Sequence, residues 1–420
     1  MDFSGEITDP IHRYIRFSDA EKQVIDEPAF QRLRRIRQLA GAHLVYPSAQ
    51  HSRFEHSLGA MHIAGLAGES LLVKGYIDSA ETVQELRIAA LLHDVGHGPF
   101  SHLFEEVLET KTSTSHEDIG KKIITKSAIS DVLRANGHNP EVIANLSFGQ
   151  SKVGFLNEII SGGLSADIMD YLPRDSYFTG AEYGKVDYHR LISSMEVANN
   201  RLALNKSALN SLESMLISRY EMFKAVYFHK TVRSAEVMLL HSMTAADADL
   251  GLTDVSLDNY LSLTDEATLD RICALKTGFA AKLATDYRDR RLLKCVYERI
   301  LHKRDRRRLV ERKTLRLIES EIAQGAGIDS SFVFADASRA PSMPLTPSKE
   351  EMYSVLVADK TGVYEMPVSD IPLVESISGF FDMLRIYTTA ENREAVERSV
   401  KKVLGDQESQ DMGVWKQHGR

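Results

Sequence analysis

Two ionisable residues, His93 and Asp94, stand side by side directly after a mainly apolar stretch at residues 86–92. That stretch should be buried in the folded protein, so the pair should lie at the edge of a core. Burying ionisable groups costs free energy unless they are paired or bind a metal ion. A divalent metal satisfies an imidazole and a carboxylate together, so this dipeptide predicts a metal site.

Two further segments carry residues of the same kinds. Residues 53–59 read RFEHSLG and contain His56, and residues 167–171 read DIMDY and contain Asp167. Imidazole with carboxylate suits a divalent cation of borderline or hard character, from Zn²⁺ and Fe²⁺ to Mn²⁺. A lone histidine is more often an ordinary hydrogen-bonded group, and a His-Asp dipeptide occurs by chance. The ordered set of three segments nevertheless favours one metal site.

Composition argues against several other classes of protein. The chain has 420 residues and a net charge of −8, so it has no overall basic field for nucleic acid. The two cysteines, Cys273 and Cys295, lack CxxC spacing, which argues against a disulfide framework or a thiolate metal site. The N-terminal residues show no signal-peptide pattern, and no apolar run of about 18 residues could span a membrane. We therefore expect a cytoplasmic protein.

The helical pattern covers most of the chain. Between residues 19 and 322, apolar residues recur at helical spacing and are separated by short polar breaks. Near the C-terminus, shorter patterns predict two strands and an amphipathic helix: residues 353–358, 381–387 and 390–404. We therefore expect a mainly α fold in three parts: a helical core at residues 1–325, a small α+β region at 326–405, and a polar tail at 406–420.

A basic run at residues 302–313 contains five arginines. Its simplest interpretation is a solvated helix face. The alternative is a site for a polyanion, such as a nucleotide triphosphate or RNA.

The motifs resemble those of the HD-domain phosphohydrolases, especially the deoxynucleoside triphosphate triphosphohydrolases. The likeness covers most of the first 240 residues, in these segments: residues 9–12, 31–34, 53–59, 93–102, 167–175 and, more weakly, 220–230. The resemblance implies an HD-domain helical core and one divalent metal ion per subunit, with Zn, Fe, Mn, Ni and Mg all left open. The implied metal ligands are His56, His93, Asp94 and Asp167.

The resemblance also implies three catalytic histidines around the reacting phosphate: His97, His102 and His116. Each alone could equally be a capping or loop residue, but three close after a metal motif favour an active site. His116 is the candidate for proton transfer, because an unperturbed imidazole titrates near neutral pH.

Nucleotide binding is implied for six further residues. At the phosphates we expect Arg53 and Arg219, and at the sugar 3′-hydroxyl we expect Tyr171 and Asp175. At the base end of the nucleotide we expect Gln38 and Tyr227. Asp167, Tyr171 and Asp175 are four residues apart, so a continuous helix places them on one face. Pro173 lies between them and predicts a kink.

A regulatory nucleotide site is implied by residues outside the metal motifs. The residues expected to hold an activating guanine nucleotide are Asp26, Gln31 and Arg34 for the base, and Arg290 and Lys294, on one helix face, for its phosphates. The resemblance thus implies a homo-oligomer, a dimer or tetramer, with a guanine-nucleotide activator. The alternative is a helix over residues 26–39 whose polar face is simply solvated.

Several positions depart from the triphosphohydrolase pattern. Ile168 stands where a phosphate-binding lysine is expected and Phe223 where a pocket histidine is, while Gly5 and Asn205 replace cations of the regulatory site. The leading hypothesis remains hydrolysis of a deoxynucleoside triphosphate to deoxynucleoside and triphosphate. The alternatives are an HD phosphohydrolase acting on another nucleotide, a monophosphate or cyclic dinucleotide, and a nucleotide-sensing scaffold with little turnover.

Overall fold

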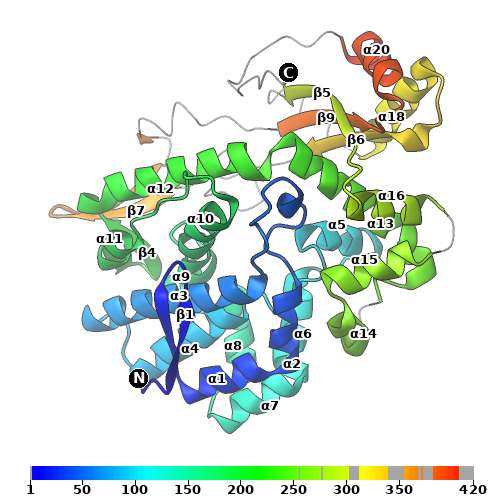
Figure 1. Cartoon of the computed structure of the whole chain (residues 1–420). Coiled ribbons are helices and arrows are strands. Elements are labelled where there is room, and N and C mark those ends of the chain that lie inside the picture. Colours follow the sequence, from blue (N-terminus) through cyan, green and yellow to red (C-terminus); the bar gives the residue numbers. More distant parts are fainter. Residues whose placement is uncertain are drawn as a thin grey trace. The chain divides into compact units, whose positions relative to one another are not determined.

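The computed structural model describes residues 2–254, 256–275, 278–301, 312–338, 354–367, 370–371 and 382–405. These form two compact units: residues 2–291 with 354–371, and residues 292–338 with 382–405. The boundary expected near residue 325 falls inside the second unit. Most of the basic run, residues 302–311, and the polar tail lie outside the described residues. The prediction of a mainly α fold with small sheets is confirmed (Figure 1).

The first unit opens with an antiparallel hairpin and three short helices: β1 (Gly5–Asp9), β2 (Arg13–Phe17), α1 (Asp19–Asp26), α2 (Pro28–Gln31) and the 3₁₀ helix η1 (Arg32–Arg35). Ser18 and Glu21 form a capping box that starts α1. The alternative of one helix over residues 26–39 is wrong, because Glu27 is extended and Pro28 starts a new helix. A proline restricts the residue before it to extended conformations and is well suited to a first turn.

Three helices form the part of the core that carries the metal motifs: α3 (Arg53–Val73), α4 (Ala80–Leu92) and α10 (Ala166–Thr179). In Figure 1, α3 packs against α4 and α10. A capping box of Ser52 and Glu55 starts α3, which sets the phase that turns Arg53 and His56 inward. The helix α4 ends at Leu92, so His93 is its C-cap and Asp94 begins the loop beyond it.

Further helices lie before, between and after those three helices in the sequence. They are the 3₁₀ turn η2 (Ala42–Leu44) and the helices α5 (His102–Thr112), α6 (His116–Lys126), α7 (Ala128–Ala135), α8 (Pro140–Ser147), α9 (Gly154–Ser161) and α11 (Tyr188–Ser193). Gly96 permits a close approach to α6, since a Cβ there would lie 2.0 Å from the carbonyl oxygen of His116. A glycine at this position thus lets the start of α6 bring His116 against the metal motif.

The first unit also contains a four-stranded sheet of order β3-β4-β7-β8, formed by β3 (Met195–Ala198), β4 (Arg201–Asn205), β7 (Ser354–Asp359) and β8 (Gly362–Pro367). The strands β3 and β4 lie in the stretch that was expected to be helical, so the sequence prediction is wrong there. The strand β4 pairs in parallel with β7, with Ala203 opposite Leu356, and this distant partner stabilises the hairpin. The strand predicted at residues 353–358 is confirmed as β7.

Helices complete the first unit on its C-terminal side: η3 (Lys206–Ala208), α12 (Leu209–Met222), the π-helical turn η4 (Phe223–Tyr227), α13 (Lys230–Leu250), α14 (Leu257–Ser262), α15 (Asp265–Cys273) and α16 (Phe279–Arg288). None of the helices in the described part of the chain combines the length and the apolar character that crossing a bilayer requires.

The second unit is a small α+β layer. Its antiparallel sheet has the order β5-β9-β6, formed by β5 (Lys294–Leu301), β9 (Asp382–Thr388) and β6 (Val333–Ser338). The short 3₁₀ turn η5 (Ser330–Phe332) leads directly into β6. The helices α18 (Arg312–Ala326) and α20 (Arg393–Leu404) bury Ile322 and Val396 against Ile386 of the sheet. The predicted strand at 381–387 and helix at 390–404 are confirmed, while β5 was expected to be helical.

Candidate metal centre

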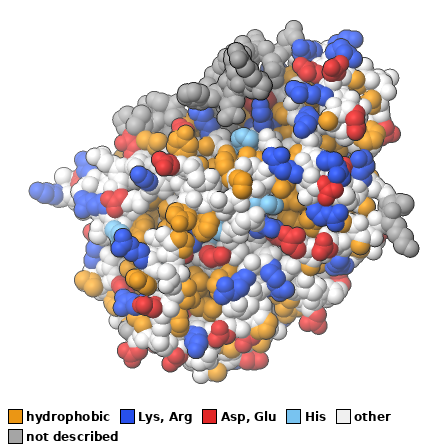
Figure 2. Space-filling view, viewed as in Figure 1, with side chains coloured by type: hydrophobic (Ala, Val, Ile, Leu, Met, Phe, Trp, Pro, Cys, Tyr) orange, Lys and Arg blue, Asp and Glu red, His pale blue; other side chains and the backbone are white. Residues whose placement is uncertain are grey.

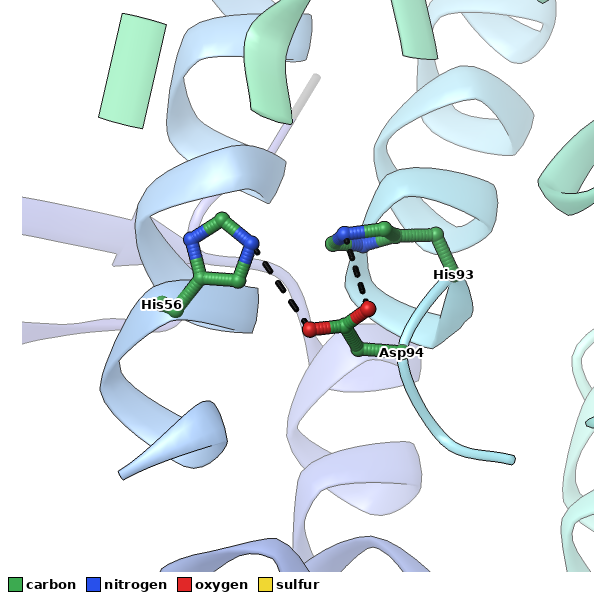
Figure 3. Close-up of side chains that lie close together, drawn as sticks. All are labelled: His56, His93 and Asp94. Atoms are coloured by element: carbon green, nitrogen blue, oxygen red, sulfur yellow. Dashed lines mark ion pairs between the residues drawn. The ribbon is translucent and has the colours of Figure 1, made fainter. Parts of the chain in front are cut away.

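Three residues from two helices converge on one point. His56 lies in the second turn of α3, and His93 and Asp94 follow α4 (Figure 3). Their potential ligand atoms all lie within 4.8 Å of one another. The distance from Asp94 Oδ2 to His56 Nε2 is 3.7 Å, and the distance from Asp94 Oδ1 to His93 Nε2 is 3.4 Å. Dashed lines mark these two pairs in Figure 3. This group could hold a metal ion.

Asp167, in the first turn of α10, completes the set of four expected ligands. Its Oδ1 lies 3.1 Å from His56 Nε2 and 3.9 Å from His93 Nε2. Its side chain is 35% exposed, whereas those of His56 and Asp94 are buried, so the site is open on this side. The structure therefore brings all four residues together.

The hydrogen bonds of the two histidines test whether the site fits a cation. His56 Nδ1 donates to Asp170 Oδ2 at 2.8 Å, and His93 Nδ1 donates to the Ala90 carbonyl at 2.7 Å. With Nδ1 protonated, a neutral imidazole turns the lone pair of Nε2 toward the carboxylates. His56 Nε2 is buried and lacks a hydrogen bond of good geometry. Lone pairs facing carboxylates repel each other unless a cation lies between them, so the residues fit a divalent metal.

The local electrostatics favour a positive charge at the same place. Burial lowers the pKa of His56, but the nearby carboxylates of Asp167, Asp170 and Asp94 outweigh it and raise that pKa to about 10, so a proton on Nε2 can take the place that a metal cation would fill. Burial raises the pKa of Asp94, yet Arg53, His93 and His97 hold it well below its ordinary range. The carboxylates therefore stay ionised and retain a cation between them.

Asp170 supports the metal centre from behind. Its Oδ1 accepts from His12 Nε2 at 2.6 Å and Arg174 Nη2 at 2.8 Å, while its Oδ2 accepts from His56 and from Arg174 Nε at 2.9 Å. Gly59 of α3 makes room for this carboxylate, because a Cβ there would lie 1.7 Å from Asp170 Oδ1. Sequence reasoning missed this role. The signal was the spacing, since Asp170 follows Asp167 by three residues on one helix face.

The three histidines expected to be catalytic form a cluster, and His97 joins this cluster to Asp94. His97 Nε2 is 3.3 Å from Asp94 Oδ1, and its ring stacks on that of His116 with centroids 4.0 Å apart. The His102 ring meets the His97 ring edge-on, 4.9 Å away, and is exposed. Burial, with the nearby charges of Arg53 and His116, holds the pKa of His97 well below its ordinary value. His97 is therefore neutral at pH 7.

Glu105 links two of these histidines, and sequence reasoning missed it. Its Oε1 contacts His116 Nδ1 and its Oε2 lies 3.2 Å from His102 Nδ1. Burial raises the pKa of Glu105, but the hydrogen bonds to His102 and His116 lower it further than burial raises it. The carboxylate is thus ionised and orients both rings. Its position three residues after His102, one turn along α5, was the available signal.

The residues expected at the sugar gather around Asp175. Its Oδ2 accepts from the Tyr227 hydroxyl at 2.6 Å, and its Oδ1 lies 2.8 Å from His51 Nε2. The ring of Tyr171 meets that of Tyr227 edge-on at 6.5 Å. Sequence reasoning missed His51, which is buried and stacks on Phe178 with centroids 4.7 Å apart. The segment before α3 therefore helps to orient Asp175.

Two of the expected ligand-binding residues hold buried polar atoms without a hydrogen-bond partner in the described part of the chain. These atoms are Nε and Nη1 of Arg219 and Oε1 of Gln38. The charge of Arg219 acts on the hydroxyls of Tyr171 and Tyr227, where it opposes the rise in pKa that burial causes. The ring of Phe223 is close to both groups: its centroid lies 4.8 Å from that of the Tyr227 ring and 5.5 Å from the Arg219 guanidinium carbon.

Arg53 connects the metal centre to the neighbouring loop. Its Nη1 donates to Asp94 Oδ2 at 2.5 Å and its Nε donates to Ser101 Oγ at 2.7 Å. The side chain is buried, so the guanidinium is fixed in direction.

The molecular face in Figure 2 shows Lys and Arg side chains mixed with Asp and Glu side chains. This mixture agrees with the net charge of −8, which excludes an overall basic field.

The residues expected at a regulatory nucleotide are only partly brought together. Gln31 accepts from Arg34 Nε at 2.7 Å, and Asp26 is exposed at the end of α1. The expectation that Arg290 and Lys294 share a helix face is wrong. The helix α16 ends at Arg288, Arg290 turns the chain through a left-handed conformation with φ of 57°, and Lys294 starts β5.

The chain is similar in sequence to several known proteins. An uncharacterised protein of Methanocaldococcus jannaschii is 36% identical over 278 residues, 63% of this chain and 57% of that protein. A deoxynucleoside triphosphate triphosphohydrolase SAMHD1 homolog of Dictyostelium discoideum is 32% identical over 70% of this chain and 60% of its own length. The matched part of the chain thus spans less than two thirds of either relative.

A solved structure resembles the whole fold. A phosphohydrolase from Bacteroides thetaiotaomicron is 25% identical, covers 92% of this chain and 99% of its own, and superimposes with a TM-score of 0.74. Family models match an HD domain at residues 53–173 and an HD-associated region at residues 186–413. The first range contains all four expected metal ligands. The chain therefore belongs to the HD-domain phosphohydrolase family.

Proposed function

We propose that this chain is a metal-dependent phosphohydrolase that cleaves deoxynucleoside triphosphates into deoxynucleoside and triphosphate. One observation carries the proposal: two imidazole lone pairs and two carboxylates face one point, beside a cluster of three further histidines. The similarity to a deoxynucleoside triphosphate triphosphohydrolase homolog supports the choice of substrate.

The residues around the site suit an attack on phosphorus. A divalent metal held by His56, His93, Asp94 and Asp167 would polarise a phosphoryl oxygen and lower the pKa of a bound water. Arg53, fixed by Asp94 and Ser101, lies where a guanidinium can bind a phosphate. Arg219, with two buried N–H groups unpaired, is suited to a second phosphate contact.

The histidine cluster supplies the proton that the leaving group needs. The water oxygen bonds to the α-phosphorus and loses a proton to the solvent, the bond from phosphorus to the 5′-oxygen breaks, and the 5′-oxygen departs with a proton from the cluster. His116 is placed for this donation, since Glu105 holds its Nδ1 and leaves Nε2 for the substrate. Neutral His97 can accept or donate a hydrogen bond at the phosphate.

The polar groups around Asp175 suit a deoxyribose. The Asp175 carboxylate already accepts from Tyr227 and is held by His51, and it can accept one more hydrogen bond from a 3′-hydroxyl. Tyr171, on the same face of α10 as Asp175, has its ring edge-on to that of Tyr227, so an aromatic side chain stands next to the carboxylate. This arrangement supports a preference for deoxynucleotides.

A second candidate, hydrolysis of a different nucleotide, is favoured by one specific observation. Ile168 is 6% exposed, and Phe223 packs on Tyr227, so neither offers a charge or hydrogen bond to a phosphate. A nucleoside monophosphate or cyclic dinucleotide needs fewer phosphate contacts than a triphosphate. A nucleotide-sensing scaffold with little turnover also remains compatible with these two positions.

Product analysis tests the proposal. The protein is incubated with each dNTP, the matching NTPs, deoxynucleoside monophosphates and cyclic dinucleotides, with Mn²⁺, Mg²⁺, Zn²⁺ or Fe²⁺ and with a chelator as control. We expect equal amounts of deoxynucleoside and triphosphate, from dNTPs only and only with metal. Orthophosphate released from monophosphates, or cleavage of a cyclic dinucleotide without dNTP turnover, would instead support the second candidate. Equal rates on GTP and dGTP would remove the case for a deoxyribose-selective pocket.

A further inference from the structure

A strained turn links the metal motif to α5. Phe100 and Ser101 have φ angles of 57° and 58°, the left-handed region that side chains other than glycine disfavour. Both residues are buried, and they lie between His97 and His102 of the histidine cluster. A strained conformation persists only where the surroundings hold it in place. The contacts that hold this turn therefore also set the position of the cluster.

One buried carboxylate, Asp265 at the start of α15, makes the central contact. Its Oδ1 accepts the backbone N–H of Phe100 at 2.7 Å, and its Oδ2 accepts the backbone N–H of Arg37 at 2.9 Å. It is 1% exposed, and it comes from the HD-associated region rather than from the HD domain itself. A single side chain thus ties together two backbone segments that are far apart in sequence.

The two tied segments both lead to site residues. Ser101 Oγ donates to the Arg37 carbonyl at 3.2 Å and accepts from Arg53 Nε at 2.7 Å. The neighbour of Arg37 is Gln38, which carries one of the unpaired buried oxygens. A series of contacts thus leads from Asp265 through the turn to Arg53 and from there to Asp94, one of the expected metal ligands.

The same corner of the fold holds the preceding backbone. The Tyr260 hydroxyl, on α14, donates to the Gly96 carbonyl at 2.7 Å. Arg32 donates to the carbonyls of Val95 at 3.0 Å and His97 at 2.7 Å, and also to Leu263, just before α15, at 3.2 Å. The segment from Asp94 to the strained turn is therefore fixed by α14, α15 and the residues between them.

We infer that Asp265 is a positioning residue for hydrolysis: it holds the Phe100–Ser101 turn, and through it Arg53 and the histidine cluster, in reactive geometry. This inference rests on the proposed function, because it concerns the rate of that reaction. Among the described residues, the polar contacts of Asp265 are with Phe100 and Arg37 and with none of the expected metal ligands. Its loss should therefore lower the rate of turnover more than the affinity for metal or nucleotide.

The test compares Asp265→Asn with Glu266→Gln. Asparagine keeps the shape of Asp265 but turns one oxygen into an NH₂ group, which opposes one of the two backbone N–H donors. Glu266, the next residue, is exposed and pairs with Arg37 Nη2 at 2.8 Å, so its variant removes a neighbouring charge without touching the turn. The measurements are kcat and KM on dNTPs, bound metal, and hydrogen exchange of the amides at residues 95–101.

For Asp265→Asn we expect kcat to fall about 10- to 100-fold, as small misplacements of reacting groups do. KM and bound metal should stay within about twofold, exchange at residues 95–101 should speed up, and Glu266→Gln should match the wild type in every measurement. Wild-type kcat, unchanged exchange, or a parallel loss of metal and nucleotide affinity in Asp265→Asn would overturn the inference.

Two provisions keep the outcome interpretable. If Asp265→Asn does not fold, Ser101→Ala takes its place: it removes the acceptor for Arg53 Nε but leaves the carboxylate contacts, and it should lower kcat with KM and metal retained. Wild-type kcat in that variant would likewise overturn the inference. If the wild-type protein hydrolyses no dNTP, the proposed function fails, whereas the exchange measurement still decides whether Asp265 holds the turn.

Discussion

Asp170→Asn keeps the size of a buried side chain but removes the negative charge behind the metal centre. The carboxylate accepts four hydrogen bonds from buried groups, one each from His12 and His56 and two from Arg174. Whichever oxygen becomes the NH₂ group of asparagine, it faces two N–H donors. If that oxygen is Oδ2, His56 must change tautomer, which places a proton on the Nε2 that should bind metal.

The expected magnitudes follow from these contacts. Removing one partner of a buried ion pair typically costs about 3–5 kcal/mol of folding free energy. Arg174 keeps a second partner, since its Nη1 donates to Asp9 Oδ2 at 2.8 Å, so the lower end, about 3 kcal/mol, is expected. Loss of the residue that orients a metal-binding histidine should weaken metal binding about 10- to 100-fold.

Asp9→Asn is the matched control. It alters the same arginine but makes no contact with His56, because Asp9 accepts from Arg174 and from the backbone N–H groups of Ile11 and His12. Urea unfolding gives the stability of both variants, and competition with a chelator gives their metal affinity. Both variants should lose stability, but only Asp170→Asn should lose metal affinity. Equal metal affinity in Asp170→Asn and the wild type would refute the proposed support of His56.

Three further predictions concern packing, pH and assembly. Gly59→Ala should destabilise the protein by about 1–3 kcal/mol in urea unfolding, because its Cβ would meet Asp170 Oδ1; unchanged stability would contradict that packing. The pKa values of Asp94 and Asp170 are held well below normal in the folded state, so their stabilisation is present above the unfolded pKa of about 4 and is lost as pH falls below it. The free energy of unfolding of the metal-free protein, measured in a buffer series from about pH 6 to about pH 2, should show this decline. A free energy that does not change with pH would argue against it. Sedimentation at micromolar concentration, with and without dGTP, should show a homo-oligomer; a monomer in both conditions would rule out the implied assembly and its guanine-nucleotide activator.

The sequence could predict that the four expected metal ligands lie close together because they belong to three short motifs at the starts and ends of helices. Ser52 and Glu55 cap α3 and thereby set the direction of His56, and the apolar stretch before His93 forms the buried helix α4. Such local signals survive folding, since capping and helical spacing act within a few residues. The structure accordingly brings His56, His93, Asp94 and Asp167 together.

The contacts between distant segments could not be predicted in this way. The hairpin of β3 and β4 depends on β7, whose Leu356 lies opposite Ala203 and about 150 residues further along the chain. Asp265 reaches a turn 165 residues earlier in the sequence. Arg290 turns the chain without a glycine or proline to mark the end of α16, which is why a continuous helix to Lys294 was expected.

The central claim, that a metal ion bound by these residues drives hydrolysis, is tested most directly by His93→Ala and Asp94→Ala. Metal content by elemental analysis and dNTP turnover are measured on the same samples, with His189→Ala, an exposed histidine on α11, as the control. We expect about one metal ion per subunit in the wild type and the control, and loss of both metal and turnover in the two variants, whose helical content is retained. Full metal occupancy together with wild-type turnover in either variant would contradict the assignment.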